Sequence, residues 1–220
     1  MTIAFYETRA GHPLNTATLV LADVCRSRTM AEEEFAPNTT QRILERCQTA
    51  LEAARRAGVP VIFVHDPHSD AMRLQDGQSR WLTGFAPRRY ESVVASKGPS
   101  CYASPYLSEI LDGAGRAILL AGLLGLDAAA ATAKDATRHG HRLTVLSDAV
   151  GFDSGALIRN SHAAESPRST PDGGGSEGRL AVHAVSTKDW LAELAPPARP
   201  PRAARWQLGA PLRRHSRILG

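Results

Sequence analysis

The sequence predicts an α/β protein, built as a three-layer, doubly wound sheet of about six mainly parallel strands. Two observations lead to this class: six short apolar runs recur along the 220 residues, and segments with helical periodicity lie between them. Strands that alternate with helices indicate a parallel sheet with helices on both faces. The length and the 43% hydrophobic content suit one globular domain with a substantial core.

The apolar runs are mostly near-continuous rather than alternating, as expected for strands that helices cover on both faces. The predicted strands span residues 16–23, 60–66, 91–96, 116–122, 141–148 and 180–186. The clearest helix is 38–58, which Asn38 or Thr39 can cap and Gly58 ends. Its apolar stripe consists of Ile43, Leu44, Cys47, Leu51 and Ala54. Further helices are expected at 104–115, 126–140 and 187–194.

Residues 1–195 form the predicted domain, and residues 196–220 form a tail rich in proline and arginine. The six arginines after Leu194 exceed the net charge of +4, so the rest of the chain is slightly acidic. This distribution argues against a nucleic-acid-binding face on the domain. Residues 67–90 are expected to form a long connection, and the Ser/Pro/Gly-rich residues 165–178 a mobile one.

No apolar run approaches the roughly 18–20 residues that span a bilayer. The first residues lack the basic-then-apolar pattern of a signal peptide. We therefore expect a cytoplasmic protein without a membrane partner. The cysteines Cys25, Cys47 and Cys101 are widely spaced and form no CxxC pair, which disfavours a disulfide framework or a structural zinc site.

Polar residues follow four of the predicted strands: Asp23, Asp66, Lys97 and Asp148. Because the carboxyl ends of parallel strands meet at one edge of a sheet, these residues could face one crevice. A strand-end aspartate can instead cap a turn or the next helix. The combination of Asp23 with Lys97, one of three lysines in the chain, favours a functional site.

Three stretches around these residues, TLVLADVCRS, VVASKGPSCYASPYLSEIL and AGLLGLDAAAATAKDATRHGHRLTVLSDAV, resemble the signature regions of the isochorismatase-like hydrolases. The segment QSRWLTGFAP, which contains Trp81, resembles the Trp-and-Gly segment of the same family. The resemblance covers roughly residues 16–195 and implies a Rossmann-like sheet of six parallel strands. It also implies homo-oligomers, for which the C-terminal tail is a candidate contact.

The resemblance also implies where a catalytic triad would lie. Asp23 and Lys97 match the Asp and Lys with which the cysteine hydrolases of the family act on amides. The position of their catalytic Cys, separated by five residues from Gly122 and by six from Asp135, is occupied by Ala128. A thiolate nucleophile is therefore missing from its expected place.

Family members that cleave vinyl ethers also lack this cysteine. The resemblance thus implies acid-catalysed cleavage of a small carboxylated metabolite, with Asp23 as proton donor and Lys97 as partner of the substrate carboxylate or of developing charge. Backbone N–H groups at the start of the helix after Gly125 could hold an anionic oxygen. The expected substrate-binding residues are Asp66, Trp81, Gly125, Ala128 and Ala129. No metal or cofactor is expected.

Departures from the family pattern keep other hypotheses open. Asp66-Pro67 stands in place of Gln-Pro, and Asp23-Val24-Cys25 in place of Asp-Met-Gln, so we expect a rebuilt site. One alternative is a non-hydrolytic member or pseudoenzyme that binds or rearranges a small molecule in a biosynthetic pathway. A second is an amidase with a relocated nucleophile at Cys25 or Cys101.

A metal site is a third alternative. Asp66 and His68 resemble half of the nicotinamidase zinc site. The sequence disfavours this site because no further His lies near Trp81 and the Cys is absent. We interpret His65 and His68 as pocket or loop residues.

Overall fold

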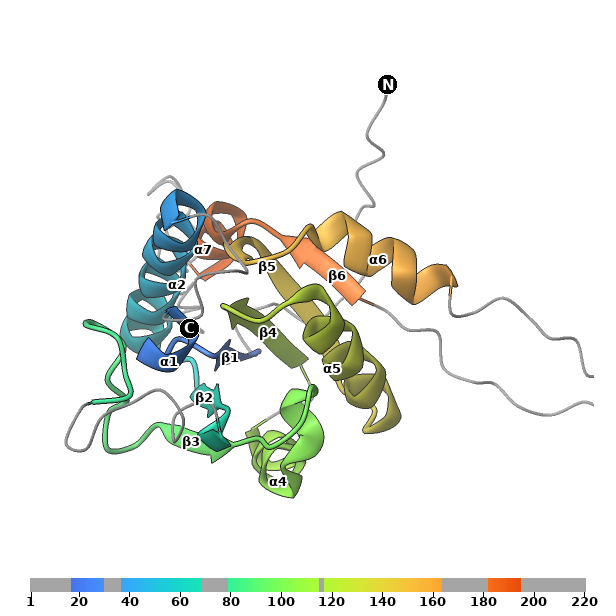
Figure 1. The fold of residues 1–220 in the computed structure, drawn as a ribbon, viewed down its shortest axis with the longest axis horizontal. Coiled ribbons are helices and arrows are strands. Elements are labelled where there is room, and N and C mark those ends of the chain that lie inside the picture. Colours follow the sequence, from blue (N-terminus) through green and yellow to red (C-terminus); the bar gives the residue numbers. More distant parts are fainter. Residues whose placement is uncertain (1–16, 30–36, 69–78, 115–116, 164–181, 195–220) are drawn as a thin grey trace, which may run out of the picture.

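The computed structural model describes residues 17–29, 37–68, 79–114, 117–163 and 182–194. In this part of the chain, strands pair into one fully parallel sheet in the order β3-β2-β1-β4-β5-β6 (Figure 1). The strands are β1 (Thr18–Ala22), β2 (Val61–His65), β3 (Ser92–Ala95), β4 (Ala117–Gly122), β5 (Arg142–Val150) and β6 (Val182–Val185). The six predicted strands and their parallel arrangement are confirmed, and β5 runs two residues further than its apolar run.

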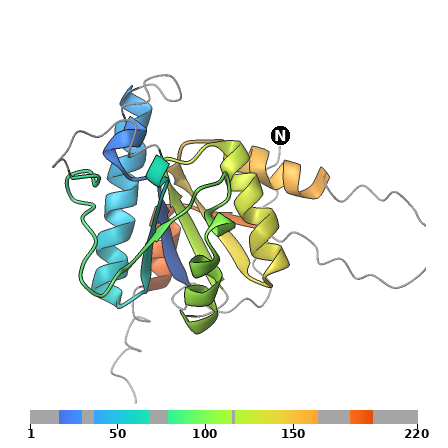
Figure 2. The same ribbon diagram turned by 60° about the horizontal axis from the view of Figure 1, so that its bottom comes forward.

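Helices cover both faces of the sheet, which gives the predicted three layers (Figure 2). One face carries α2 (Pro37–Ala57) and α7 (Thr187–Leu194), and the other carries α4 (Pro105–Ala114), α5 (Leu126–Arg138) and α6 (Ser154–Ala163). The short helix α1 (Arg26–Thr29) and the 3₁₀ turn η2 (Cys101–Ala103) lie in loops. The sequence did not predict α1 or α6, because α1 has a single turn and α6 lacks a clear apolar stripe.

The core consists of two clusters, one on each face, because successive side chains of a strand point to opposite faces. Leu19, Leu21 and Phe63 pack under α2 and Trp190 of α7. Val20, Ile62 and Leu120 pack under α4 and α5. Small side chains let α5 approach the sheet closely; those that are buried there are Ala129, Ala133 and Ala136. Cys47 lies in the first cluster, as its place on the apolar stripe predicts.

The register of the sheet brings four strand ends level with one another. Ala22 at the end of β1 pairs with Val64 of β2 and with Gly122 of β4, and His65 pairs with Ala95 of β3. The order of strands reverses at β1, since β2 lies on one side of it and β4 on the other. Open α/β sheets bind ligands at the carboxyl ends of the strands beside such a switch point.

The predicted tail 196–220 and the predicted mobile stretch 165–178 lie outside the described residues, as does the end of the predicted domain at 195. Among the described helices, none has the length and apolarity that a bilayer crossing requires.

Candidate active site

A small cavity of about 30 Å³ opens at the switch point. Its wall combines residues from the ends of β1, β2 and β3 with the turn between β4 and α5. The lining residues are Ala22, Asp23, Val64, His65, Asp66, Ser96, Gly98, Pro99, Ser100, Cys101, Leu124 and Ala128. Of the residues that the sequence singles out for the site, Asp23, Asp66 and Ala128 thus line one cavity.

Asp23 has an unusual backbone conformation. Its φ is +57°, and it is the one non-glycine residue with positive φ among the described residues. This left-handed conformation costs an L-residue about 1–2 kcal/mol, although Asp tolerates it better than most. The amide of Asp23 donates to the Val64 carbonyl at 2.9 Å, which ties the residue to β2. Strained residues of this kind cluster at functional sites, where the surrounding structure holds them.

Gly122 brings the turn after β4 against the end of β1. Its φ is +134°, and a Cβ atom at this position would lie 1.9 Å from the carbonyl oxygen of Ala22. The same carbonyl accepts a hydrogen bond from the amide of Leu123 at 3.0 Å. Only glycine allows this close approach, which places the start of α5 beside Asp23.

The first turn of α5 offers the cavity a methyl group and no nucleophile. Ala128 is half-buried and lines the cavity, whereas the side chain of Ala129 is fully buried in the core. Gly125 is the N-cap residue, makes no side-chain cap, and accepts a hydrogen bond from the amide of Ala129 at 3.0 Å. Gly125 and Ala129 therefore shape the turn but do not line the cavity, and their predicted substrate contacts stay predictions.

Hydrogen bonds hold both ends of the loop after β3. Ser96 donates its amide to the His65 carbonyl at 2.9 Å and its hydroxyl to the Ser100 carbonyl at 2.8 Å. Cys101 donates its amide to the Thr132 hydroxyl at 3.0 Å, and this hydroxyl donates to the Ala128 carbonyl at 2.8 Å. The loop is thus joined to α5 across the cavity.

Lys97 lies in this loop between Ser96 and Gly98, which both line the cavity. Its own side chain is exposed and is not part of the lining. The structure therefore places Lys97 at the rim, and its role as an anion partner stays a prediction.

Asp66 and His65 form the β2 side of the cavity. Asp66 is half-buried, and its Oδ1 accepts a hydrogen bond from the backbone amide of His68 at 2.8 Å. The Asp-x-His pair is thus joined by a local turn. No cluster of three or more His, Cys, Asp or Glu side chains that could hold a metal lies within the described ranges.

Trp81 packs behind the cavity wall and does not line the cavity. Its ring meets those of Phe63 and His65 edge-on, with centroids 5.2 and 5.7 Å apart. The neighbouring Arg80 reaches His65, with Nη1 2.9 Å from Nε2. Arg80 could not be predicted as part of the site, because no local sequence signal marks it. Ser96 was not predicted either, although the strand-end rule finds it because this residue directly follows β3.

The three cysteines are buried and form no disulfide. Cys101 lines the cavity, but burial outweighs the hydrogen bonding with Thr132 and raises the pKa of its thiol to about 12. Burial also raises the pKa of Cys47 to about 12, and its thiol donates to the Ala149 carbonyl. Cys25 is buried, and its backbone bridges to Trp81. A relocated thiolate is therefore disfavoured at Cys101, which is the cysteine in the cavity wall.

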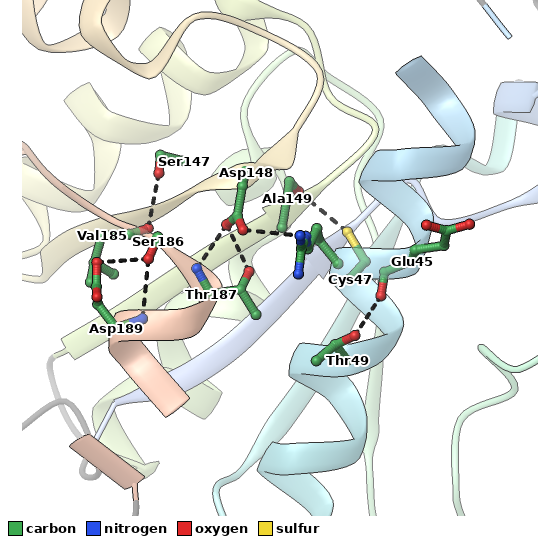
Figure 3. A network of polar contacts seen from close by, with 11 residues as sticks. Glu45, Cys47, Thr49, Ser147, Asp148, Ala149, Val185, Ser186, Thr187 and Asp189 are labelled. Carbon is green, nitrogen blue, oxygen red and sulfur yellow. Dashed lines mark hydrogen bonds and ion pairs between the residues drawn. The ribbon is translucent and has the colours of Figure 1, made fainter. Parts of the chain in front are cut away.

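Asp148 has a structural role instead (Figure 3). Its Oδ1 accepts hydrogen bonds from the amide and the hydroxyl of Thr187, each at 2.7 Å. Its Oδ2 lies 3.5 Å from Nε of Arg46. Asp148 lies inside β5, and Thr187 is the first residue of α7, so the carboxylate accepts from one of the free N–H groups at the start of that helix.

The strand order and the acidic cavity at the switch point define a doubly wound α/β protein of the Rossmann-like kind. A family model described as the isochorismatase domain matches residues 17–166, and the chain belongs to this family. Among curated proteins, none matches the sequence.

Solved structures share the fold at low sequence identity. An isochorismatase from Pseudomonas putida is 18% identical, with a TM-score of 0.60 over 82% of this chain and 93% of the other. A cysteine hydrolase from Pseudomonas syringae is 17% identical, with a TM-score of 0.61 over 86% and 98%. An N-carbamoylsarcosine amidase from Thermoplasma acidophilum is 20% identical, with a TM-score of 0.56 over 78% and 96%.

Proposed function

We propose that the protein is a hydrolase that cleaves the vinyl ether of a small carboxylated metabolite by general acid catalysis. The observation that carries this proposal is the position of Asp23. Its backbone is held in a strained conformation, and it lines a cavity in which the first turn of α5 presents Ala128. An acid with alanine at the place of the family's nucleophile suits a reaction that needs a proton and water but no covalent intermediate.

In the proposed reaction, the carboxyl group of Asp23 donates its proton to the terminal CH2 of the enol ether. The C=C bond becomes a C–C bond to the new methyl group, and the adjoining carbon becomes an oxocarbenium ion. Water adds to this carbon and returns a proton to the Asp23 carboxylate. The resulting hemiketal collapses to pyruvate and an alcohol, so that one water is consumed in each cycle.

This chemistry requires Asp23 to carry a proton before the reaction. Asp66 lines the same cavity, and two carboxyl groups that share a site disfavour the ionisation of both. We assign Lys97 at the rim to the substrate carboxylate. The amides at the start of α5 are assigned to an anionic oxygen of the substrate, since a helix N-terminus favours negative charge.

A substrate panel tests the reaction class. Isochorismate, other enolpyruvyl ethers and simple amides are offered to the wild type and to Asp23→Asn, Lys97→Ala and Cys101→Ala variants, and pyruvate and ammonia are measured. The proposal expects pyruvate from at least one enol ether, with full activity in Cys101→Ala. Ammonia release by the wild type that is lost in Cys101→Ala would instead show a relocated nucleophile. Saturable binding of a panel member without any turnover would show a non-hydrolytic member.

A further inference from the structure

A second cavity, of about 160 Å³, lies at the opposite ends of the strands from the candidate active site. Its wall includes Thr18, Val61 and Ser92, which are the first residues of β1, β2 and β3. Ile110 of α4 also contributes to the wall. A cavity of about 150 Å³ can bind benzene, so this one has room for a molecule with a single ring. Neither the family resemblance nor the proposed reaction uses this cavity.

Thr18 supplies the first sign of a ligand. The residue is fully buried, and its hydroxyl oxygen has no hydrogen-bond partner in the described part of the chain. Buried polar groups are nearly always paired, so an orphaned hydroxyl in a cavity wall calls for an explanation. A bound molecule with a polar group would supply the missing partner.

Arg55 supplies the second sign. Its Nε donates to Glu91 Oε1 at 2.7 Å, and its Nη2 donates to Glu91 Oε2 at 2.8 Å and to the Ala86 carbonyl at 3.0 Å. The Arg55 side chain is 10% exposed, and its Nη1 has no partner among the described residues. The guanidinium is thus fixed in place with two N–H groups left over.

The charge and the polarity of the wall select the kind of ligand. Glu91 is 2% exposed in its side chain and neutralises the charge of Arg55, so the pair offers N–H donors with little net charge. Val59, Val61 and Ile110 supply apolar surface beside these groups. We propose that this cavity binds a small uncharged molecule that carries a carbonyl group on an apolar ring or chain. The carbonyl accepts from Arg55, and a second polar group pairs with Thr18.

Benzamide is the probe, because it combines a carbonyl, an N–H donor and an apolar ring without charge. The full-length protein is titrated with benzamide and followed by calorimetry and by amide chemical shifts. We expect saturable binding, with shifts at Gly58 and Tyr90, which line this cavity. Thr18→Val removes the hydroxyl but keeps the size and branching of the side chain. It should raise the dissociation constant for benzamide at least about fivefold.

Two further variants keep the test decisive. Ile110→Trp fills the cavity from α4 and should abolish binding even if Thr18→Val fails to fold. Asp23→Asn alters the other cavity and should leave the dissociation constant unchanged. The proposal is overturned if benzamide shows no saturable binding up to its solubility limit. It is also overturned if folded Thr18→Val or Ile110→Trp binds like the wild type, or if Asp23→Asn is the variant that weakens binding.

Discussion

The amide of Asp23 donates a 2.9 Å hydrogen bond to the carbonyl of Val64, so β2 holds the acid at the end of β1 in a left-handed conformation. This relationship joins the fold to the proposed chemistry. The parallel register places Val64 beside Ala22, and Asp23, which follows Ala22, lines the cavity. A conformation that an ordinary residue avoids is therefore maintained at the one position to which we assign the proton transfer.

The conformation of Asp23 has a consequence for stability. The unfolding free energy of Asp23→Gly should exceed that of Asp23→Ala by about 1 kcal/mol. Glycine adopts positive φ without steric cost, whereas the Cβ of alanine is crowded there. Chemical denaturation of the two variants measures the difference. The same pair at Asp127, in the first turn of α5, should show the opposite order, since glycine weakens a helix. Equal stability of the two Asp23 variants would contradict the strain.

Gly122 should tolerate no side chain. Gly122→Ala is expected to lose at least about 3 kcal/mol of unfolding free energy, because its Cβ would collide with the Ala22 carbonyl at positive φ. Gly113→Ala is the matched control. A Cβ at Gly113 of α4 meets nothing within 4 Å, so this variant should gain roughly 0.5–1 kcal/mol. If Gly122→Ala is as stable as the wild type, the backbone at Gly122 does not lie as close to the Ala22 carbonyl as described.

The cap on α7 predicts a moderate loss of stability without a loss of function. Asp148→Ala removes the acceptor of both Thr187 hydrogen bonds and should cost about 1–2 kcal/mol. Arg46→Ala removes only the 3.5 Å ion pair, which is partly exposed, and should cost no more than about 0.5 kcal/mol. Thermal unfolding compares the two variants. A larger effect of Arg46→Ala would contradict the capping role.

The buried pair of Glu91 and Arg55 predicts a pH-dependent difference. Burial opposes the ionisation of Glu91, but the hydrogen bonds and the charge of Arg55 outweigh it and hold the pKa of this carboxyl below its usual 4.5. The pair therefore stabilises the fold fully above pH 4.5, and this contribution is lost as the pH falls through the lowered pKa. Glu91→Gln should cost about 3 kcal/mol at pH 7, because it leaves a buried guanidinium without its counter-charge.

Denaturation curves from pH 7 down to pH 3 measure this effect. The difference in unfolding free energy between the wild type and Glu91→Gln should stay constant near neutral pH and become smaller as the pH falls. Glu109→Gln changes an exposed residue of α4, and its unfolding free energy should depend on pH as that of the wild type does. A difference for Glu91→Gln that becomes larger in acid would contradict the assignment.

The strands and the long helices could be predicted because their signals are local. Near-continuous apolar runs identify buried parallel strands, and the stripe from Ile43 to Ala54 identifies the face of α2. The strand-end rule also located Asp23 and Asp66, since the register of the sheet makes parallel strand ends level. The same rule could not assign Asp148, whose partner Thr187 lies 39 residues further along the chain.

Other features of the site depend on packing that the sequence does not reveal. Trp81 is a predicted substrate contact, and the structure shows its ring packed on Phe63 and His65 outside the cavity lining. Arg80 reaches His65 across the long connection after β2, and neither residue signals the other. Hydrogen bonds of Ser96 and Cys101 hold the loop that contains Lys97, and the side chain of Lys97 is exposed at the rim.

The rate of pyruvate release from an enolpyruvyl ether tests the central claim most directly. With the best substrate of the panel, Asp23→Asn should lower kcat/KM by about 10²- to 10⁴-fold, because asparagine fits the same backbone but cannot donate a carboxyl proton. The Thr18→Val variant, at the opposite end of β1, should keep the wild-type rate. An Asp23→Asn protein that folds normally and releases pyruvate at the wild-type rate would contradict the account.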